Sequence, residues 1–418
     1  MGCGQPCLEK QTMAARPQQP VMILSHGKVA WDMSVRAMRL PDDTYQADDE
    51  TLERRLSGPW GCDNCGLRRG RVCSHADCGC PVDVTLAGAP GEAVKRRGKC
   101  PLGRWDQTEN VVEYHRRLVQ SAISHAKRQQ CPPAFSGRGI VVPAGGICST
   151  YGKPVRYFDC ALTAAHMLRA RGCELPIQFW FLKGELEPGM VAIAKRMQVD
   201  CVDAEECGVQ EQMRVPGGWQ LKVYAILHSS FAEVLHLDAD NIVARDPSYL
   251  FDTPEFREHG AMFWTDNPKP GIHTPYVTEG IWDRLGASGR EPEVDWETGQ
   301  MVIDKRRCWS ALQLTRHFAD HADYWGGMNN GHHQVGPRIW YGDKTDFHAG
   351  WSLTGTPRWF QDYYEWSDPT QKQGFYRHFD PQRRLIFQHQ IQFKYEMAAG
   401  KPIPGLVGNE LIAKAVTA

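Results

Sequence analysis

The sequence lacks a strong excess of charge, a long apolar run and any internal repeat. Its 418 residues include 48 Lys or Arg and 49 Asp or Glu, a net charge of −1 at neutral pH. The overall charge of the protein therefore does not favour binding to nucleic acid or to a membrane surface. No stretch of 18 apolar residues is found, so a membrane-spanning helix is not predicted. The first residues also lack the apolar core of a signal peptide. We expect a cytoplasmic protein without a transmembrane segment.

Cysteine, by contrast, is abundant, with 15 residues. Their number is odd, and those from Cys131 onward are spread singly through apparent core segments. This pattern argues against a disulfide scaffold and favours a reducing compartment. Apolar residues make up 42% of the chain and charged residues 23%. A chain of this length and composition predicts one large α/β domain with a smaller second part.

Six of the cysteines fall within 39 residues, in a segment without helical or strand periodicity: Cys62, Cys65, Cys73, Cys78, Cys80 and Cys100. Paired thiolates on tight turns are typical of a structural zinc site, which stabilises a segment that has no apolar core. We predict Zn²⁺ bound by Cys62, Cys65, Cys78 and Cys100, with Cys73, Cys80 and His75 as alternative ligands. Free or disulfide-bonded cysteines in a loop are the other interpretation.

The same segment is basic. Residues 54–105 contain ten Lys or Arg and four Asp or Glu, a local charge of +6. Such a surface can bind phosphates, which makes a nucleic acid a candidate partner. A solvated basic surface, or one that covers an acidic face of the main domain, is an equally good interpretation.

Apolar patterns after the basic segment alternate between helix and strand. We predict helices at 109–127, 155–171, 190–197 and 219–229, and strands at 138–146, 175–182, 198–202 and 233–237. This βαβ order predicts a mainly parallel sheet flanked by helices, with ligands at the carboxyl ends of the strands. The strand at 138–146 opens into a loop at Gly145, where a nucleotide is expected.

The expected organisation has five parts. They are an N-terminal extension (1–55) with a small hairpin near 21–32, a cysteine-rich module (56–105), a linker helix (106–135), the main domain (136–400) and a C-terminal tail (401–418).

The most informative stretch is EVLHLDADNIVARDP, from Glu233 to Pro247. An apolar strand there leads Asp238 and Asp240 into a turn. Two carboxylates separated by one small residue can hold a hard cation, Mg²⁺ or Mn²⁺, that bridges substrate phosphates. The pattern is typical of nucleotide-sugar enzymes, although an aspartate-rich surface turn would look the same.

Four blocks support the first interpretation: GWQLKVYAILHSSFAEVLHLDADNIVARDPSYLF from Gly218, GAMFWTD from Gly260, ETGQMVIDKRR from Glu297 and GDKTDFHAGW from Gly342. In content and order they resemble the fungal Golgi α-mannosyltransferases of glycosyltransferase family 71, over about residues 139–393. The resemblance implies a GT-A fold, a GDP- or UDP-sugar donor and transfer with retention of configuration.

Further site residues follow from these blocks and from residue chemistry. GT-A enzymes often add a histidine to the metal ligands, for which His389 in LIFQHQIQFK is the candidate by order. Lys222 and Lys344 are candidates for contacts to the donor, or else a solvated helix lysine and part of a helix start. Gly299 allows close backbone approach to a ligand. Beside it, Glu297 and Gln300, together with Asp266, are candidates for catalysis or sugar binding; a turn before a buried strand is the alternative.

These observations predict a metal-dependent GT-A glycosyltransferase. It would transfer a hexosyl group, mannosyl or glucosyl, from a nucleotide sugar to a hydroxyl acceptor such as a glycan. Two alternatives stay open. One is a transferase that modifies a hydroxymethylated pyrimidine in DNA, which the basic segment suggests, and the other is a non-catalytic carbohydrate- or nucleotide-binding protein.

Overall fold

The computed structural model describes residues 23–25, 28–30, 109–150, 153–213, 217–267, 285, 295–325, 328–329, 333–334, 342–367 and 374–415. The predicted cysteine-rich module lies outside this part, so the zinc ligands Cys62, Cys65, Cys78 and Cys100 stay a prediction. Within the N-terminal extension, β1 (Ile23–Ser25) and β2 (Lys28–Ala30) form the small antiparallel hairpin that the sequence predicts.

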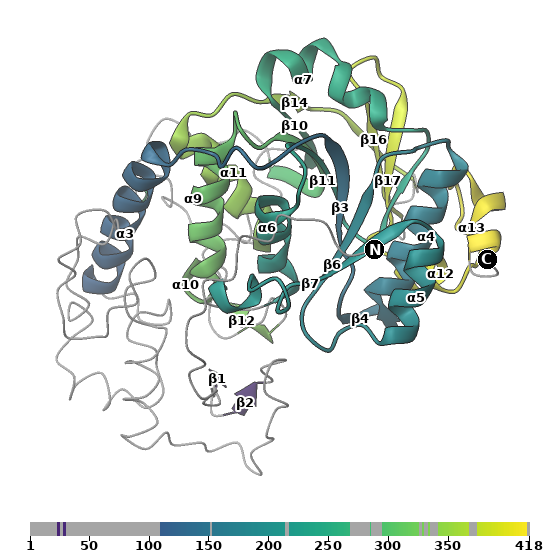
Figure 1. Cartoon of the computed structure of the whole chain (residues 1–418), viewed down its shortest axis with the longest axis horizontal. Coiled ribbons are helices and arrows are strands. Elements are labelled where there is room, and N and C mark those ends of the chain that lie inside the picture. The colour runs from purple at the N-terminus through teal and green to yellow at the C-terminus, as the bar shows by residue number, and fades with distance from the viewer. Residues whose placement is uncertain are drawn as a thin grey trace.

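The linker helix is present as α3 (Glu109–Arg128). It packs on α9 (Trp309–Asp320) and α11 (Gly342–Thr354) through a separate apolar cluster. Val119 of α3 and Phe318 of α9 are fully buried there. The helix therefore belongs to the main body of the protein, at its left edge in Figure 1.

A seven-stranded sheet forms the centre of the molecule. Its strands are β3 (Arg138–Pro143), β6 (Ile177–Phe181), β7 (Val199–Asp203), β8 (Glu233–Leu237), β10 (Ala261–Asn267), β11 (Asp295–Asp304) and β14 (Trp359–Gln361). Their order across the sheet is β14-β10-β11-β8-β3-β6-β7. Within this sheet only β11 runs antiparallel to its neighbours. The predicted mainly parallel α/β sheet is confirmed.

Helices cover both faces of this sheet (Figure 1). On one side lie α4 (Tyr157–Ala170) and α5 (Pro188–Arg196), and on the other α6 (Gly218–His228), α9 and α11. The side chains of strand β3 pack against helices on both faces of the sheet. Ile140 and Val142 belong to the core beneath α4, and Val141 belongs to the core beneath α6. A strand buried on both faces carries a continuous apolar run.

A second, smaller sheet is antiparallel and separate from the first. Its order is β15 (Tyr364–Trp366), β16 (Tyr376–Phe379), β17 (Leu385–His389) and β9 (Asn241–Val243). Strand β9 begins directly after Asp240, and β17 ends at His389. The two strands pair with His389 opposite Asn241. This register brings the C-terminal part of the chain to the end of β8.

The remaining elements lie in the connections. A hairpin of β4 (Ile147–Thr150) and β5 (Lys153–Arg156) follows β3, where the sequence predicted only a loop. The connections also contain α7 (Pro254–His259), α10 (Ala322–Trp325), the short strands β12 (Met328–Asn329) and β13 (His333–Gln334), and two 3-10 helices at Gln210–Gln212 and Ser248–Asp252. No helix in the described part of the chain is both long and apolar enough to cross a membrane.

The C-terminal residues differ from the tail expected after residue 400. Helices α12 (Lys394–Ala398) and α13 (Asn409–Ala415) pack beside α4, and Ile403 and Ile412 are fully buried in the core. The apolar residues here are few and widely spaced, so the sequence contains no periodic pattern that predicts these packed helices.

Candidate active site

The two aspartates of the DAD turn stand at the carboxyl end of β8. The turn is closed by a hydrogen bond from Asn241 N to Asp238 O, 3.0 Å. Asp238 N donates to Gly299 O on β11, 2.8 Å. The side-chain nitrogen Nδ2 of Asn241 donates to the same oxygen, 2.9 Å. The position of the two carboxylates is therefore set by the neighbouring strand as well as by β8.

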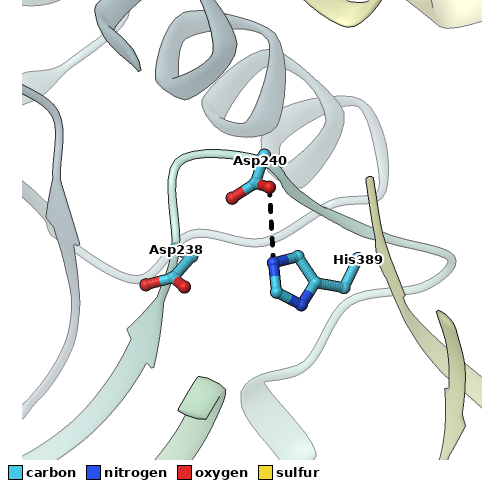
Figure 2. Close-up of side chains that lie close together, drawn as sticks. All are labelled: Asp238, Asp240 and His389. Atoms are coloured by element: carbon cyan, nitrogen blue, oxygen red, sulfur yellow. Dashed lines mark ion pairs between the residues drawn. The ribbon is translucent and has the colours of Figure 1, made fainter. Parts of the chain in front are cut away.

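His389 reaches Asp240 through the small sheet. Beyond the β9–β17 pairing, Gln390 N donates to Asp240 O, 2.8 Å. The imidazole Nε2 of His389 then lies 3.3 Å from Asp240 Oδ2 (Figure 2). Ligand atoms of Asp238, Asp240 and His389 lie within 4.8 Å of one another, the only group of three such residues in the described part of the chain. The structure brings together all three predicted ligands of the catalytic metal.

Glu297 stands behind His389. Its Oε2 lies 3.3 Å from His389 Nδ1, and its Oε1 accepts a hydrogen bond from Gly299 N, 2.6 Å. Burial opposes the negative charge, but the adjacent His389 and the Gly299 amide lower the pKa of Glu297 to about 2. Burial also opposes protonation of His389, yet Glu297 raises its pKa above the usual value. A carboxylate that orients a ligating histidine is a common outer partner of a metal site.

Gly299 has a steric role at this point. A Cβ atom on it would lie 2.6 Å from His389 Nδ1 and 3.0 Å from Glu297 Oε1. Only glycine leaves room for the imidazole between β11 and Asp240.

Lys222 is buried beneath the site, with 5% of its side chain exposed. Its ammonium lies 2.8 Å from Asp238 Oδ1 and 2.6 Å from Asp343 Oδ2, and it donates to Thr298 O, 3.2 Å. Burial alone would lower the pKa of Lys222, but Asp238 and Asp343 raise it above its usual value. In return, although burial opposes ionisation of Asp238, Lys222 and His236 hold the pKa of this carboxyl well below its usual range. Lys222 is not the solvated helix lysine of the alternative interpretation.

Lys394, which the sequence analysis missed, forms an ion pair with Asp240. Burial lowers the pKa of this lysine. It stands at the start of α12, five residues after His389. No periodicity or motif indicated it, because its position depends on the pairing of β17 with β9.

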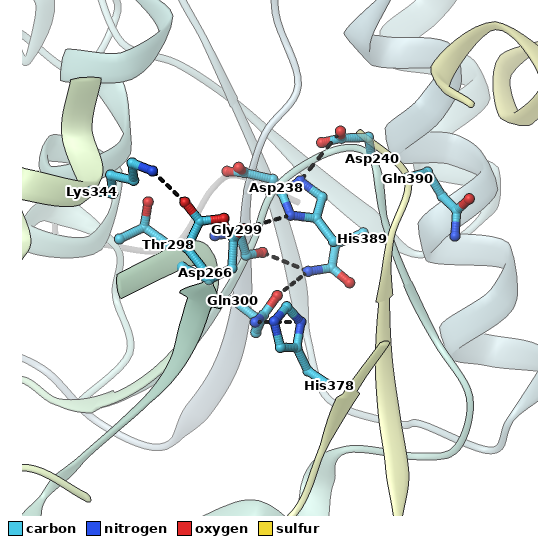
Figure 3. Close-up of polar contacts among 12 residues, drawn as sticks. Asp238, Asp240, Asp266, Thr298, Gly299, Gln300, Lys344, His378, His389 and Gln390 are labelled. Atoms are coloured by element: carbon cyan, nitrogen blue, oxygen red, sulfur yellow. Dashed lines mark hydrogen bonds and ion pairs between the residues drawn. The ribbon is translucent and has the colours of Figure 1, made fainter. Parts of the chain in front are cut away.

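Figure 3 shows the other predicted residues: Asp266 and Lys344 lie together on one side of the site, and Gln300 lies beside His378. Asp266 at the end of β10 forms an ion pair with Lys344 near the start of α11, with 15% and 18% of their side chains exposed. Gln300 is fully buried. Its Oε1 accepts from Asn241 Nδ2, 2.5 Å, and its Nε2 lies 3.1 Å from His378 Nδ1. Gln300 supports the site from below, so these contacts give its predicted catalytic role no support.

Gly145 lies at the end of β3, in the predicted nucleotide loop. A Cβ atom there would lie 1.8 Å from Oε2 of Glu185, which follows β6.

A separate concavity of about 510 Å³ lies at the end of the sheet opposite the carboxylate cluster, lined by Arg138, Glu233, Asp304 and neighbouring residues. It contains none of the predicted site residues and is distant from the carboxylate cluster.

Comparison with known proteins shows which sequences this chain resembles. A family described as "Mannosyltransferase putative" matches residues 137–279, which include β3, β8 and the DAD turn. The chain resembles fungal mannosyltransferases. Alpha-1,2-mannosyltransferase MNN21 of Candida albicans is 32% identical over 194 residues, which cover 41% of this chain and 28% of that protein. Alpha-1,2-mannosyltransferase MNN5 of Saccharomyces cerevisiae is 24% identical over 223 residues, which cover 43% and 36%. The chain thus spans about a third of these relatives.

Among solved structures, an active-site mutant of LgtC aligns at 14% identity with a TM-score of 0.38, over 67% of this chain and 95% of that chain. The resemblance to the family of fungal mannosyltransferases that the sequence predicts is confirmed by the family match and by the relatives.

The donor set fits a divalent cation. Two carboxylates and one imidazole suit Mn²⁺ or a related ion, and the outer contact from Glu297 to His389 Nδ1 leaves Nε2 on the side of Asp240. Asp238, Asp240 and His389 would hold the ion.

Proposed function

We propose that the protein is a metal-dependent glycosyltransferase that transfers a hexosyl group from a nucleotide sugar to a hydroxyl acceptor. The observation that carries this proposal is the cluster of Asp238, Asp240 and His389 at the carboxyl edge of the sheet. In open α/β sheets ligands bind at that edge. The sequence similarity to mannosyltransferases supports the same assignment.

The leaving group of such a reaction is a nucleoside diphosphate, whose developing charge must be neutralised. A bound divalent cation supplies Lewis-acid stabilisation of that charge. Lys394 adds a second positive group, since its ammonium already lies against Asp240 and is placed to contact a phosphate beside it. Lys222 keeps Asp238 ionised and therefore ready to ligate.

The sugar is expected on the side of β10 and α11. Asp266, Lys344 and Thr298 bring carboxylate, ammonium and hydroxyl groups there (Figure 3). Sugar hydroxyls need such donors and acceptors. Because the relatives are named α-mannosyltransferases, we propose mannose as the transferred sugar, a glycan hydroxyl as the acceptor and retention of configuration. The DNA acceptor has no observation in its favour among the described residues.

The proposal is tested by measuring hydrolysis of GDP- and UDP-hexoses by the full chain, with and without Mn²⁺. Asp240→Ala removes a cation ligand, so we expect Mn²⁺-dependent turnover to fall at least about 100-fold while the circular dichroism spectrum is unchanged. Asp200→Asn on the exposed face of β7 is the matched control. Full activity of Asp240→Ala would reject the metal site, and no turnover of any nucleotide sugar by the unmutated chain would reject the function.

A further inference from the structure

A partly buried carboxylate, that of Glu185, lies at the carboxyl edge of the sheet, away from the cation ligands. Glu185 lies in the turn that follows β6, where its own N–H donates to Leu182 O, 3.1 Å. Its Oε2 accepts a hydrogen bond from Leu182 N, 2.7 Å. The carboxylate lies against Gly145 and Gly146, two glycines in the loop that follows β3. Cβ atoms on Gly145 and Gly146 would lie 1.8 Å from Oε2 and 3.3 Å from Oε1.

This carboxylate has no cationic partner among the described residues. The nearby Lys183 is committed to Glu205, 2.6 Å away, and Asp203 at the end of β7 adds negative charge. Burial, helped by Asp203 and opposed by the hydrogen bond from Leu182 N, raises the pKa of Glu185 to about 7. A buried carboxylate is costly unless hydrogen-bond donors satisfy it. Leu182 N satisfies only part of its capacity to accept.

The position of Glu185 relative to the cation ligands is set by the sheet. Strands β8, β3 and β6 are adjacent and parallel, so their carboxyl ends lie along one edge. Neighbouring strands are about 4.8 Å apart, which puts the end of β6 about 10 Å from the end of β8. The span from a metal-bound diphosphate, across the ribose, to the hydrogen-bonding edge of a purine has a comparable length. On the opposite side of the cation ligands, along the same edge of the sheet, lie Glu297 and the polar groups of β10 and α11.

We propose that Glu185 binds the nucleobase of the donor and selects guanine over uracil, an inference that rests on the proposed function. Guanine presents two adjacent donors, N1–H and the 2-amino group, which match the two oxygens of one carboxylate. Uracil presents a single N3–H between two carbonyl oxygens, which a carboxylate repels. Ile147, 65% exposed directly after Gly146, offers an apolar surface for the face of the base.

The decisive experiment measures dissociation constants of GDP, inosine diphosphate and UDP for the full chain with Mn²⁺, by titration calorimetry. We expect GDP to bind most tightly and inosine diphosphate, which lacks the 2-amino group, to bind less tightly. Glu185→Gln should weaken GDP about ten- to hundredfold because a charge-assisted pair is lost, and should leave UDP unchanged or improved. Glu206→Gln, an exposed glutamate in the turn after β7, is the control and should behave as the unmutated chain.

Gly145→Ala provides a second variant, since its methyl group displaces Glu185 without changing any charge. It should lower the preference for GDP over UDP in the same direction. Equal affinity for GDP and UDP, or an unchanged preference in a folded Glu185→Gln variant, overturns the assignment of Glu185 while the transferase proposal stands. Failure of all three nucleotides to bind overturns the proposed function itself, and the inference with it.

Discussion

Glu297 and His389 form a carboxylate–imidazole pair in which Glu297 Oε2 lies 3.3 Å from His389 Nδ1, while His389 Nε2 faces Asp240. The carboxylate thus stands on the side of the ring away from Asp240, where the outer partner of a ligating histidine is commonly found. The sequence predicts Glu297 as a catalytic residue, and the geometry gives it a positioning role. The two roles make different predictions.

Replacing Glu297 by Gln separates them. If the carboxylate positions His389, the variant should bind Mn²⁺ about 10- to 100-fold more weakly, and excess Mn²⁺ should restore kcat. The measurement is donor hydrolysis as a function of Mn²⁺ concentration. A kcat that stays low at saturating Mn²⁺ would instead support a direct catalytic role.

Gly299→Ala should damage the same site through sterics alone. Its Cβ atom would lie 2.6 Å from His389 Nδ1, so the imidazole must move away from Asp240. We expect the apparent Mn²⁺ affinity to fall at least about tenfold, as for loss of an outer partner of a metal ligand. The matched control is Gly189→Ala, where a Cβ atom meets nothing within 4 Å. An unaltered Mn²⁺ titration would show that His389 is not a ligand.

Lys222→Met should destabilise the fold. The substitution leaves Asp238 and Asp343 partly buried without their cation, a loss of about 3–5 kcal/mol in the free energy of unfolding. Urea denaturation measures it, with the exposed Lys195→Met on α5 as control. Added Mn²⁺ should recover part of the loss, because the ion restores positive charge at Asp238. A stability equal to that of the unmutated chain would contradict the ion-pair assignment.

The preference for GDP over UDP should depend on pH. Burial raises the pKa of Glu185 to about 7, so its carboxylate is mostly ionised at pH 8 and mostly protonated at pH 6. Only the ionised form accepts from both guanine donors, and the preference should therefore fall about tenfold between pH 8 and pH 6. Both nucleotides carry the same diphosphate, whose titration cancels in the ratio of their dissociation constants. A ratio that stays constant with pH would contradict the role of Glu185.

The local part of the fold could be predicted from the sequence. Apolar runs predict the strand at 138–143 and the helix at 218–228 without any information on tertiary contacts. The Asp-Ala-Asp sequence after β8 likewise predicts a turn with two carboxylates. His389 was found by its order along the chain. The mainly parallel sheet followed from the βαβ rhythm.

The contacts between distant segments could not be predicted in the same way. Lys394 and Glu185 reach the carboxyl edge through the pairing of β17 with β9 and through the turn after β6, and neither belongs to a motif. The burial of Gln300 depends on Asn241 and His378, two residues far from it in sequence. Such partners become visible only when register and packing are known.

The small sheet has a consequence for how this protein can change over time. Asp240 and His389 are joined by the backbone ladder of β9 and β17, whose hydrogen bonds do not depend on side-chain identity. Substitutions along β9 and β17 that preserve this pairing can therefore accumulate while Asp240 and His389 keep their spacing. The geometry of the cluster depends on the register of two strands and not on the side chains that surround it.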